Sequence, residues 1–198
     1  YKCISEENTL DIRTEFKEIK GRTILNNIRS TINGIDNIKK YCKTDSLDLI
    51  PDVEFIKKLK YTDENLPSVE FNSLINSEYN FRINLKKEEV LNITDTSVEK
   101  LLSAWIHTKK MFRYKKRYSF ITNDNLFRID LTIVKENKWD NKKREYNLYK
   151  KFTESNILKN PENYEIEIEY IGSIIKNDIY PIDNFISKVW IDYENKNE

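Results

Sequence analysis

The chain has 198 residues, a length that suits one domain with a sizeable buried core. Its 34 basic and 33 acidic residues nearly cancel, so bulk electrostatics do not predict a nucleic-acid or acidic-lipid partner. Two cysteines, Cys3 and Cys42, exclude a disulfide scaffold and favour a reducing compartment. No apolar run is long enough to cross a bilayer. We therefore expect a single domain spanning residues 1–198, located inside the cell and away from membranes.

The first third of the chain gives strand and helix signals. Apolar and charged residues alternate over 9–19, which predicts a strand. Apolar residues then recur at helical spacing over 22–32, and the following Asn-Gly pair predicts the end of a helix. Residues 35–68 show no clear period, apart from a strand signal around 55–62.

The rest of the chain gives clearer signals. Two short alternating runs over 69–87 predict a hairpin. Residues 95–110 predict a helix with Trp105 on its apolar side. Further predicted elements are a hairpin over 111–135, a polar helix over 141–152, a strand over 164–172 and a helix over 180–190 with Trp190 on its apolar side.

Four of the predicted strands place charged or polar side chains on one face and apolar side chains on the other. The charged faces hold Arg82, Asn84 and Lys86; Arg113, Lys115 and Arg117; Arg128 and Asp130; and Glu165, Glu167 and Glu169. A sheet with one solvated face would explain any one of these strands. Three glutamates in a row repel one another and favour a nearby cation, whereas three cations in a row favour a polyanion such as phosphate.

The apolar faces decide where the charged faces point. Helices that carry Trp105 and Trp190 have to cover them, so we expect the charged faces to line the inside of a closed barrel. Carboxylates hold Mg²⁺ or Mn²⁺ through oxygen ligands, and a basic wall binds phosphate oxygens. Such a lumen suits the metal-dependent hydrolysis of a triphosphate, which depends on positioning and electrostatic stabilisation.

Three stretches with these faces carry a family resemblance: FRYKKRYSF (112–120), FRIDLTIVK (127–135) and YEIEIEYIG (164–172), with looser matches over 69–85 and 10–19. They resemble the triphosphate tunnel metalloenzymes, and within them the RNA 5′-triphosphatase domain of mRNA capping enzymes from large DNA viruses. The resemblance implies an α+β fold in which eight antiparallel strands close into a tunnel with helices outside. It also implies removal of the γ-phosphate from nascent RNA.

The resemblance further implies a setting for the protein. The substrate would be 5′-triphosphate RNA or a nucleoside triphosphate, and the cofactor Mg²⁺ or Mn²⁺. A guanylyltransferase and a methyltransferase would be fused or associated, with the last residues of the chain as a linker to the former. The location would be the host cytoplasm or the virion of a large DNA virus.

The site residues follow from the same matches. Phosphates would be bound by Arg113, Lys115, Arg117, Arg128 and Arg82. Glu167 would orient the attacking water, Asp130 would hold a basic neighbour and Glu165 would support this network. The metal ligands would be Glu169 together with Asp11 and Glu15 of the first strand.

The first strand departs from the family pattern. The family has a pair of glutamate ligands there, and the matching positions hold Asp11 and Arg13. An arginine repels the cation that it should help to bind. Either Glu15 substitutes for the missing ligand, or the alignment is offset, or the metal site is lost and Arg13 pairs with the glutamate strand. The last case predicts a tunnel that binds a triphosphate RNA end, a nucleotide or a protein partner without hydrolysis.

Overall fold

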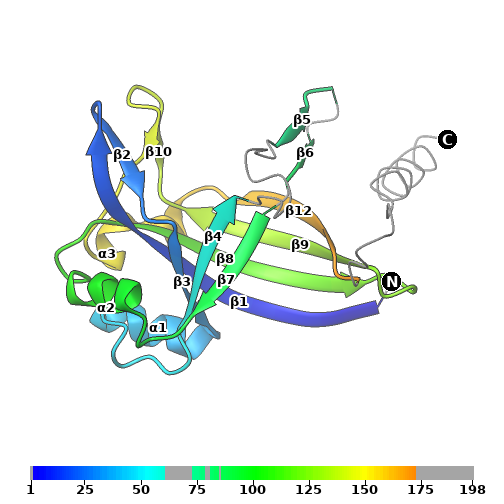
Figure 1. The fold of residues 1–198 in the computed structure, drawn as a ribbon, viewed down its shortest axis with the longest axis horizontal. Coiled ribbons are helices and arrows are strands. Elements are labelled where there is room, and N and C mark those ends of the chain that lie inside the picture. The colour runs from blue at the N-terminus through cyan, green and yellow to red at the C-terminus, as the bar shows by residue number, and fades with distance from the viewer. Residues whose placement is uncertain (1, 61–72, 79–80, 85, 173–198) are drawn as a thin grey trace.

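The computed structural model describes residues 2–60, 73–78, 81–84 and 86–172 (Figure 1). Helices in this part of the chain are α1 (Ile35–Thr44), α2 (Thr96–Ser103) and α3 (Phe152–Ser155), followed by a 3₁₀ turn (Ile157–Lys159). The strands are β1 (Lys2–Ile19), β2 (Arg22–Leu25), β3 (Ile28–Asn33), β4 (Glu54–Lys60), β5 (Leu74–Asn76), β6 (Phe81–Ile83), β7 (Lys86–Leu91), β8 (Lys110–Ile121), β9 (Phe127–Glu136), β10 (Trp139–Asp140), β11 (Glu145–Tyr146) and β12 (Asn163–Tyr170).

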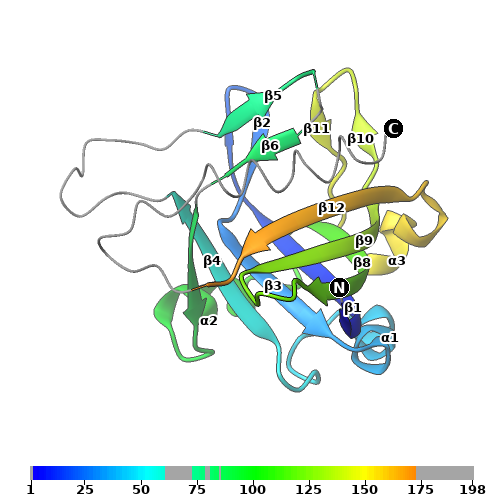
Figure 2. The same cartoon turned by 90° about the vertical axis from the view of Figure 1, so that its right-hand side faces the viewer.

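One large antiparallel sheet forms the body of the molecule. Its strands follow the order β12-β9-β8-β1-β3-β4-β7, and β2 pairs with β1 outside this path. The sheet curls into a half-barrel with the helices around its outside (Figures 1 and 2). Two small hairpins, β5–β6 and β10–β11, are separate two-stranded sheets. The expected α+β class with mostly antiparallel strands is therefore confirmed.

The register of the sheet gathers the charged side chains on its concave face. Asp11 of β1 pairs with Arg113 of β8, and Arg113 pairs with Glu136 of β9. On the other flank, Glu167 of β12 pairs with Asp130 of β9. Because residues paired across antiparallel strands point to the same side, these side chains share one surface. The charged residues that alternate with apolar ones in each separate strand therefore form a single polar face of the sheet.

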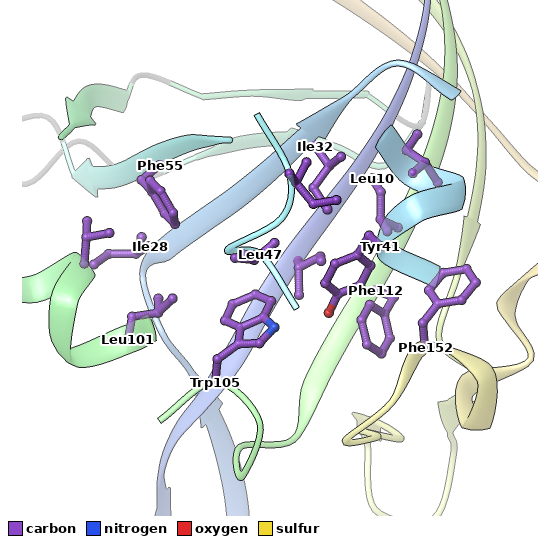
Figure 3. Close-up of a cluster of buried hydrophobic side chains, with 14 of the residues drawn as sticks. Leu10, Ile28, Ile32, Tyr41, Leu47, Phe55, Leu101, Trp105, Phe112 and Phe152 are labelled. Atoms are coloured by element: carbon purple, nitrogen blue, oxygen red, sulfur yellow. The ribbon is translucent and has the colours of Figure 1, made fainter. Parts of the chain in front are cut away.

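The convex face carries the main hydrophobic core. Leu10 of β1 and Phe112 of β8 are fully buried there beneath Tyr41 of α1 and Trp105, which follows α2 (Figure 3). Phe152 of α3 packs on Phe112 with ring centroids 5.4 Å apart and nearly perpendicular ring planes. This confirms that Trp105 covers the apolar side of the sheet, although it lies in the turn after α2 rather than in the helix. The predicted helix over 180–190, with Trp190, lies outside the described residues.

The closed eight-stranded tunnel is not formed by the described residues, and in this respect the prediction is wrong. The edge strands β12 and β7 do not pair with each other. One physical reason lies in β7, where Lys86, Lys87, Glu88 and Glu89 put charges on both faces of the strand. A strand without an apolar face gains little from packing, and a charged edge strand discourages pairing.

The predicted helix over 22–32 is also wrong, because this segment forms β2 and β3. Ile28 and Ile32 are four residues apart, and residues at this spacing share a face in a strand as well as in a helix. Cross-strand pairing of Leu10 with Ile32 and of Ile12 with Ser30 shows that the sheet determines the structure here. Helix α1, which begins directly after Gly34, was not predicted.

The predicted polar helix over 141–152 is replaced mainly by the β10–β11 hairpin. The Asp140 carboxylate accepts hydrogen bonds from the backbone N–H groups of Lys142 (2.9 Å) and Lys143 (3.1 Å), which folds the chain into a turn. Arg144 then adopts a left-handed conformation with φ of 56°. By contrast, the helix predicted over 95–110 is confirmed in its first half as α2, and the chain then turns into β8 at Lys110. No helix in the described part of the chain is long and apolar enough to span a membrane.

Replacing Phe112 by alanine should lower the free energy of unfolding by about 3 to 5 kcal/mol, because the change leaves a cavity between Tyr41 and Phe152. Urea denaturation followed by circular dichroism measures this loss. The matched control is Ile106→Ala, at a side chain that is exposed, which should change stability by no more than about 0.5 kcal/mol. Equal losses in the two variants would contradict the assignment of the core.

Candidate functional site

The concave face encloses a cavity of about 670 Å³. Its walls come from β1, β3, β4, β7, β8, β9, β11 and β12, with Ser73 and Asn84 contributed from beside the β5–β6 hairpin. Three acidic side chains line it, Asp11, Glu136 and Glu165, against twice as many basic ones. The basic side chains are Arg13, Arg29, Lys58, Lys60, Lys86 and Arg113. An excess of cations in a partly enclosed space attracts polyanions.

A buried ion pair lies at the centre of this face. Lys115 Nζ lies 2.7 Å from Asp11 Oδ2, and both side chains are more than nine-tenths buried. The Asp11 carboxylate also accepts a hydrogen bond from the Thr31 hydroxyl (3.0 Å), and the Arg29 guanidinium lies 3.9 Å away. Burial alone would raise the pKa of Asp11, but Lys115 and Arg29 outweigh it and lower that pKa. Asp11 is therefore ionised and committed to its basic neighbours.

Arg113 connects three strands beside this pair. Its Nε lies 3.2 Å from Glu136 Oε2, and its Nη2 contacts the Glu165 carboxylate of β12. The Tyr146 hydroxyl donates a hydrogen bond of 3.0 Å to the other oxygen of Glu136. Burial, and then the Glu136 charge, raise the pKa of Tyr146 to about 12, so the phenol keeps its proton. This network links the cavity wall to the β10–β11 hairpin.

A second cluster surrounds Asp130, which is almost fully buried. Its carboxylate accepts a hydrogen bond of 2.7 Å from the Ser119 hydroxyl. Arg117 Nε lies 3.6 Å and Arg128 Nε 3.2 Å from Asp130 Oδ2. Each arginine also reaches a glutamate of β12: Arg117 lies 3.8 Å from Glu167 Oε2, and Arg128 lies 2.5 Å from Glu169 Oε2. The buried aspartate thus positions two cations whose far ends meet half-exposed carboxylates.

Two predicted residues lie apart from these clusters. The Glu15 carboxylate accepts a hydrogen bond of 3.0 Å from the backbone N–H of Lys109 and lines a smaller groove rather than the main cavity. Arg82 is exposed on β6, within the separate β5–β6 hairpin. Burial lowers the pKa of Lys86, and so do the charges of Lys58 and Arg82, which indicates crowded cations near the cavity.

Arg13 has a structural partner that the sequence did not indicate. Its Nε and Nη2 donate hydrogen bonds of 2.9 and 2.8 Å to the backbone carbonyl of Asn26, at the corner between β2 and β3. Burial, and then the charge of Arg29, lower the pKa of Arg13. In the part of the chain that the structure describes, Arg13 forms no ion pair with the glutamate strand, so the expected pairing of Arg13 with that strand is wrong.

The predicted metal ligands do not come together. Within residues 2–60, 73–78, 81–84 and 86–172, no three acidic, histidine or cysteine side chains form a group that could hold a metal ion. Asp11 shares a row of the sheet with Glu136, whereas Glu169 pairs with Arg128. Glu136 and Arg128 both belong to β9 and stand about 26 Å apart along it at the usual rise of a strand, so Asp11 and Glu169 lie far from each other. The described carboxylates therefore do not fit a metal centre, and we derive no step through one.

Several residues of the site were not predicted. Glu136 continues the alternation of β9, but the buried Val134 interrupts its run of polar residues. Arg29 was assigned to a helix because of the spacing of the neighbouring isoleucines. Tyr146 was also placed in a helix, and its contact with Glu136 depends on the β10–β11 turn. These three residues could have been predicted only if Arg29 and Glu136 had been assigned to strands and the turn after Asp140 had been recognised.

No family model matches the chain, and no curated protein is significantly similar to it.

Substituting Asp11 by asparagine should lower the free energy of unfolding at pH 7 by about 3 to 5 kcal/mol, because Lys115 is left charged and buried without its partner. Lys115→Met should cost a similar amount, and the double variant should lose less than the sum of the two. Denaturant titrations of the four proteins measure this coupling. Additive losses would contradict a direct interaction.

The effect of Asp11→Asn should also depend on pH. Folding lowers the pKa of Asp11, so its charge contributes stability above the unfolded-state value of 3.8 and loses it as the pH falls through the folded-state value. The stability difference between the wild type and Asp11→Asn should therefore shrink as the pH falls below about 4. Denaturant titrations at stepwise lower pH measure it. A constant difference over that range would contradict the role of the ionised carboxylate.

Proposed function

We propose that the protein is a polynucleotide 5′-triphosphatase, which removes the γ-phosphate from the 5′ end of nascent RNA during mRNA cap formation. One observation carries this proposal: cations of β8 and β9 share a concave face with carboxylates of β1, β9 and β12. A triphosphate has several anionic oxygens, and a row of arginines and lysines matches them. The resemblance to triphosphate tunnel metalloenzymes agrees with this chemistry.

The ion pairs of this face differ in burial, which suggests how a phosphate enters. The side chains of Glu167 and Glu169 are both 58 % exposed, so their pairs with Arg117 and Arg128 contribute little to stability. A phosphate oxygen can therefore replace either carboxylate at small cost. The buried Asp130 would keep both guanidinium groups in place during this exchange.

The same exchange would leave the glutamates of β12 free to act. Glu167, released from Arg117, would orient the attacking water, as the resemblance implies. Arg117 and Arg128, which share the buried Asp130, would offset the charge on the transferring phosphoryl group. The resemblance predicts Mg²⁺ or Mn²⁺ as the cofactor, whereas the described carboxylates form no group that would hold either metal, so a phosphate-release assay has to include both metals. The partners that the resemblance predicts are guanylyltransferase and methyltransferase domains, in the host cytoplasm or the virion.

A second candidate function is binding of the RNA 5′ triphosphate without hydrolysis. Two observations favour it: Asp11, at a predicted ligand position, is already paired with Lys115, and Arg13 stands at the neighbouring position. The cations of the cavity would still bind a triphosphate-ended RNA, a nucleotide or an acidic segment of a partner protein.

Purified protein with Mg²⁺ or Mn²⁺ should release phosphate from 5′-triphosphate RNA, and Arg117→Gln should lower kcat/KM about a hundredfold because a phosphate contact is lost. The matched control is Lys116→Gln on the same strand. Lys116 pairs with Glu6 on the opposite face, so this variant should keep activity within about twofold. A colorimetric phosphate assay measures all three proteins.

Two results would decide against hydrolysis. Folded wild-type protein that releases no phosphate with either metal would contradict the triphosphatase proposal. If that protein still binds tripolyphosphate, with an affinity unchanged by metal or chelator, the second candidate function holds.

A further inference from the structure

Two hairpins rise side by side next to the cavity (Figures 1 and 2). One is the β1–β2 hairpin, residues 16–25, and the other is the β10–β11 hairpin, residues 138–146. We refer to them together as the hairpin pair. The Glu145 carboxylate accepts a hydrogen bond of 3.0 Å from the backbone N–H of Thr23, which joins the two. A groove of about 210 Å³ runs between them, and its charged lining residues are Lys109 and Lys143 together with Glu15 and Glu145.

The tips of the hairpin pair are strongly basic. Residues 17–22 and 138–145 hold seven lysines and arginines against three acidic residues, in a chain with a net charge of only +1. Lys142, Lys143 and Arg144 are all exposed, and none of them forms an ion pair with another residue that the structure describes. Such a concentration of unpaired positive charge is a suitable surface for a phosphate backbone.

Arg144 occupies a position where another residue would fit more easily. Its φ of 56° lies in the left-handed region, which glycine and asparagine adopt at lower cost. The chain therefore has a third consecutive cation at a turn position that does not favour it. We take this as a sign that the charge at the tip serves binding rather than folding.

Exposed aromatic rings accompany these cations. Trp139 of β10 is 44 % exposed and packs edge-on against Tyr146, with ring centroids 4.9 Å apart. Tyr146 itself lines the main cavity, so Trp139 lies next to its rim. On the other hairpin, Phe16 is 63 % exposed. Exposed aromatic rings beside exposed basic side chains are the usual composition of a surface that binds single-stranded nucleic acid, since bases stack on the rings.

We propose that the hairpin pair binds the single-stranded RNA that follows the 5′ end. Trp139 stacks on a base near the 5′ terminus, and Lys142, Lys143 and Arg144 contact the phosphates of the following nucleotides. This inference rests on the proposed function, because a triphosphate at Arg117 and Arg128 would lie on the same concave face as Glu136 and Tyr146, and the RNA that follows would reach Trp139 there. The hairpin pair gives the protein a preference for RNA over free nucleotides.

The test uses two ligands, one for each proposed binding surface. A fluorescently labelled 12-nucleotide RNA with a 5′ hydroxyl probes the hairpin pair, and inorganic tripolyphosphate probes the cavity. Trp139→Ala should weaken RNA binding about tenfold. The triple variant Lys142→Gln, Lys143→Gln, Arg144→Asn should weaken it further and reduce the slope of log affinity against log salt by about 2. Asparagine is used at position 144 because it tolerates the positive φ.

The matched control removes three exposed lysines from helix α1 on the convex side: Lys39→Gln, Lys40→Gln and Lys43→Gln. This control should bind RNA as the wild type does, and all variants should bind tripolyphosphate equally well. Fluorescence anisotropy and calorimetry measure the two affinities.

The outcomes separate the inference from the proposed function. Wild-type affinity for RNA in Trp139→Ala and in the triple variant, or an equal loss in the α1 control, would overturn the role of the hairpin pair. So would wild-type protein that binds no RNA. If instead no protein binds tripolyphosphate or releases phosphate, while the hairpin variants still lose RNA binding, the proposed function fails and the RNA surface remains.

Discussion

The ion pair between Asp11 and Lys115 is the interaction on which the concave face depends. Asp11 contacts residues of both neighbouring strands, since Thr31 belongs to β3 and Lys115 to β8. Buried charges are tolerated only when they are paired, so this contact fixes the register of β1. A slip by one residue would turn Asp11 into the convex core and bring Leu10 to the polar side. The curled sheet with a charged interior therefore depends on this one pairing.

The acidic residues of the face divide into two groups by depth. Asp11 and Asp130 are buried, and each holds basic side chains in a fixed position. Glu167 and Glu169 belong to an edge strand and are largely exposed. Cations that are already positioned by buried acids need little reorganisation to meet a phosphate. The exposed glutamates can change partners because water screens their charges. A site of this kind keeps its shape while its outer pairs exchange.

The sequence predicted strand faces better than it predicted the arrangement of strands. The alternation of Arg113, Lys115 and Arg117 fits only a period of two, and the structure confirms that their face is concave. The pair Ile28 and Ile32 fits both a helix and a strand, so the local pattern was ambiguous. Alternation shows which face of a sheet a residue lies on, but it does not show which residues of the neighbouring strands it is paired with. For this reason the sequence could assign Asp11 and Glu169 to one face but could not show that they lie far apart along the strands.

In the proposed function, the Glu136 carboxylate lies between the cavity and the proposed RNA-binding hairpin. One of its oxygens contacts Arg113 at the cavity wall, and the other accepts the hydrogen bond from Tyr146 beneath Trp139. The cations of the cavity attract any polyanion, so they cannot by themselves distinguish an RNA end from a nucleotide. Specificity requires a contact that only one ligand makes. A base stacked on Trp139 would be such a contact, and Trp139 is linked through Tyr146 and Glu136 to Arg113 in the cavity wall.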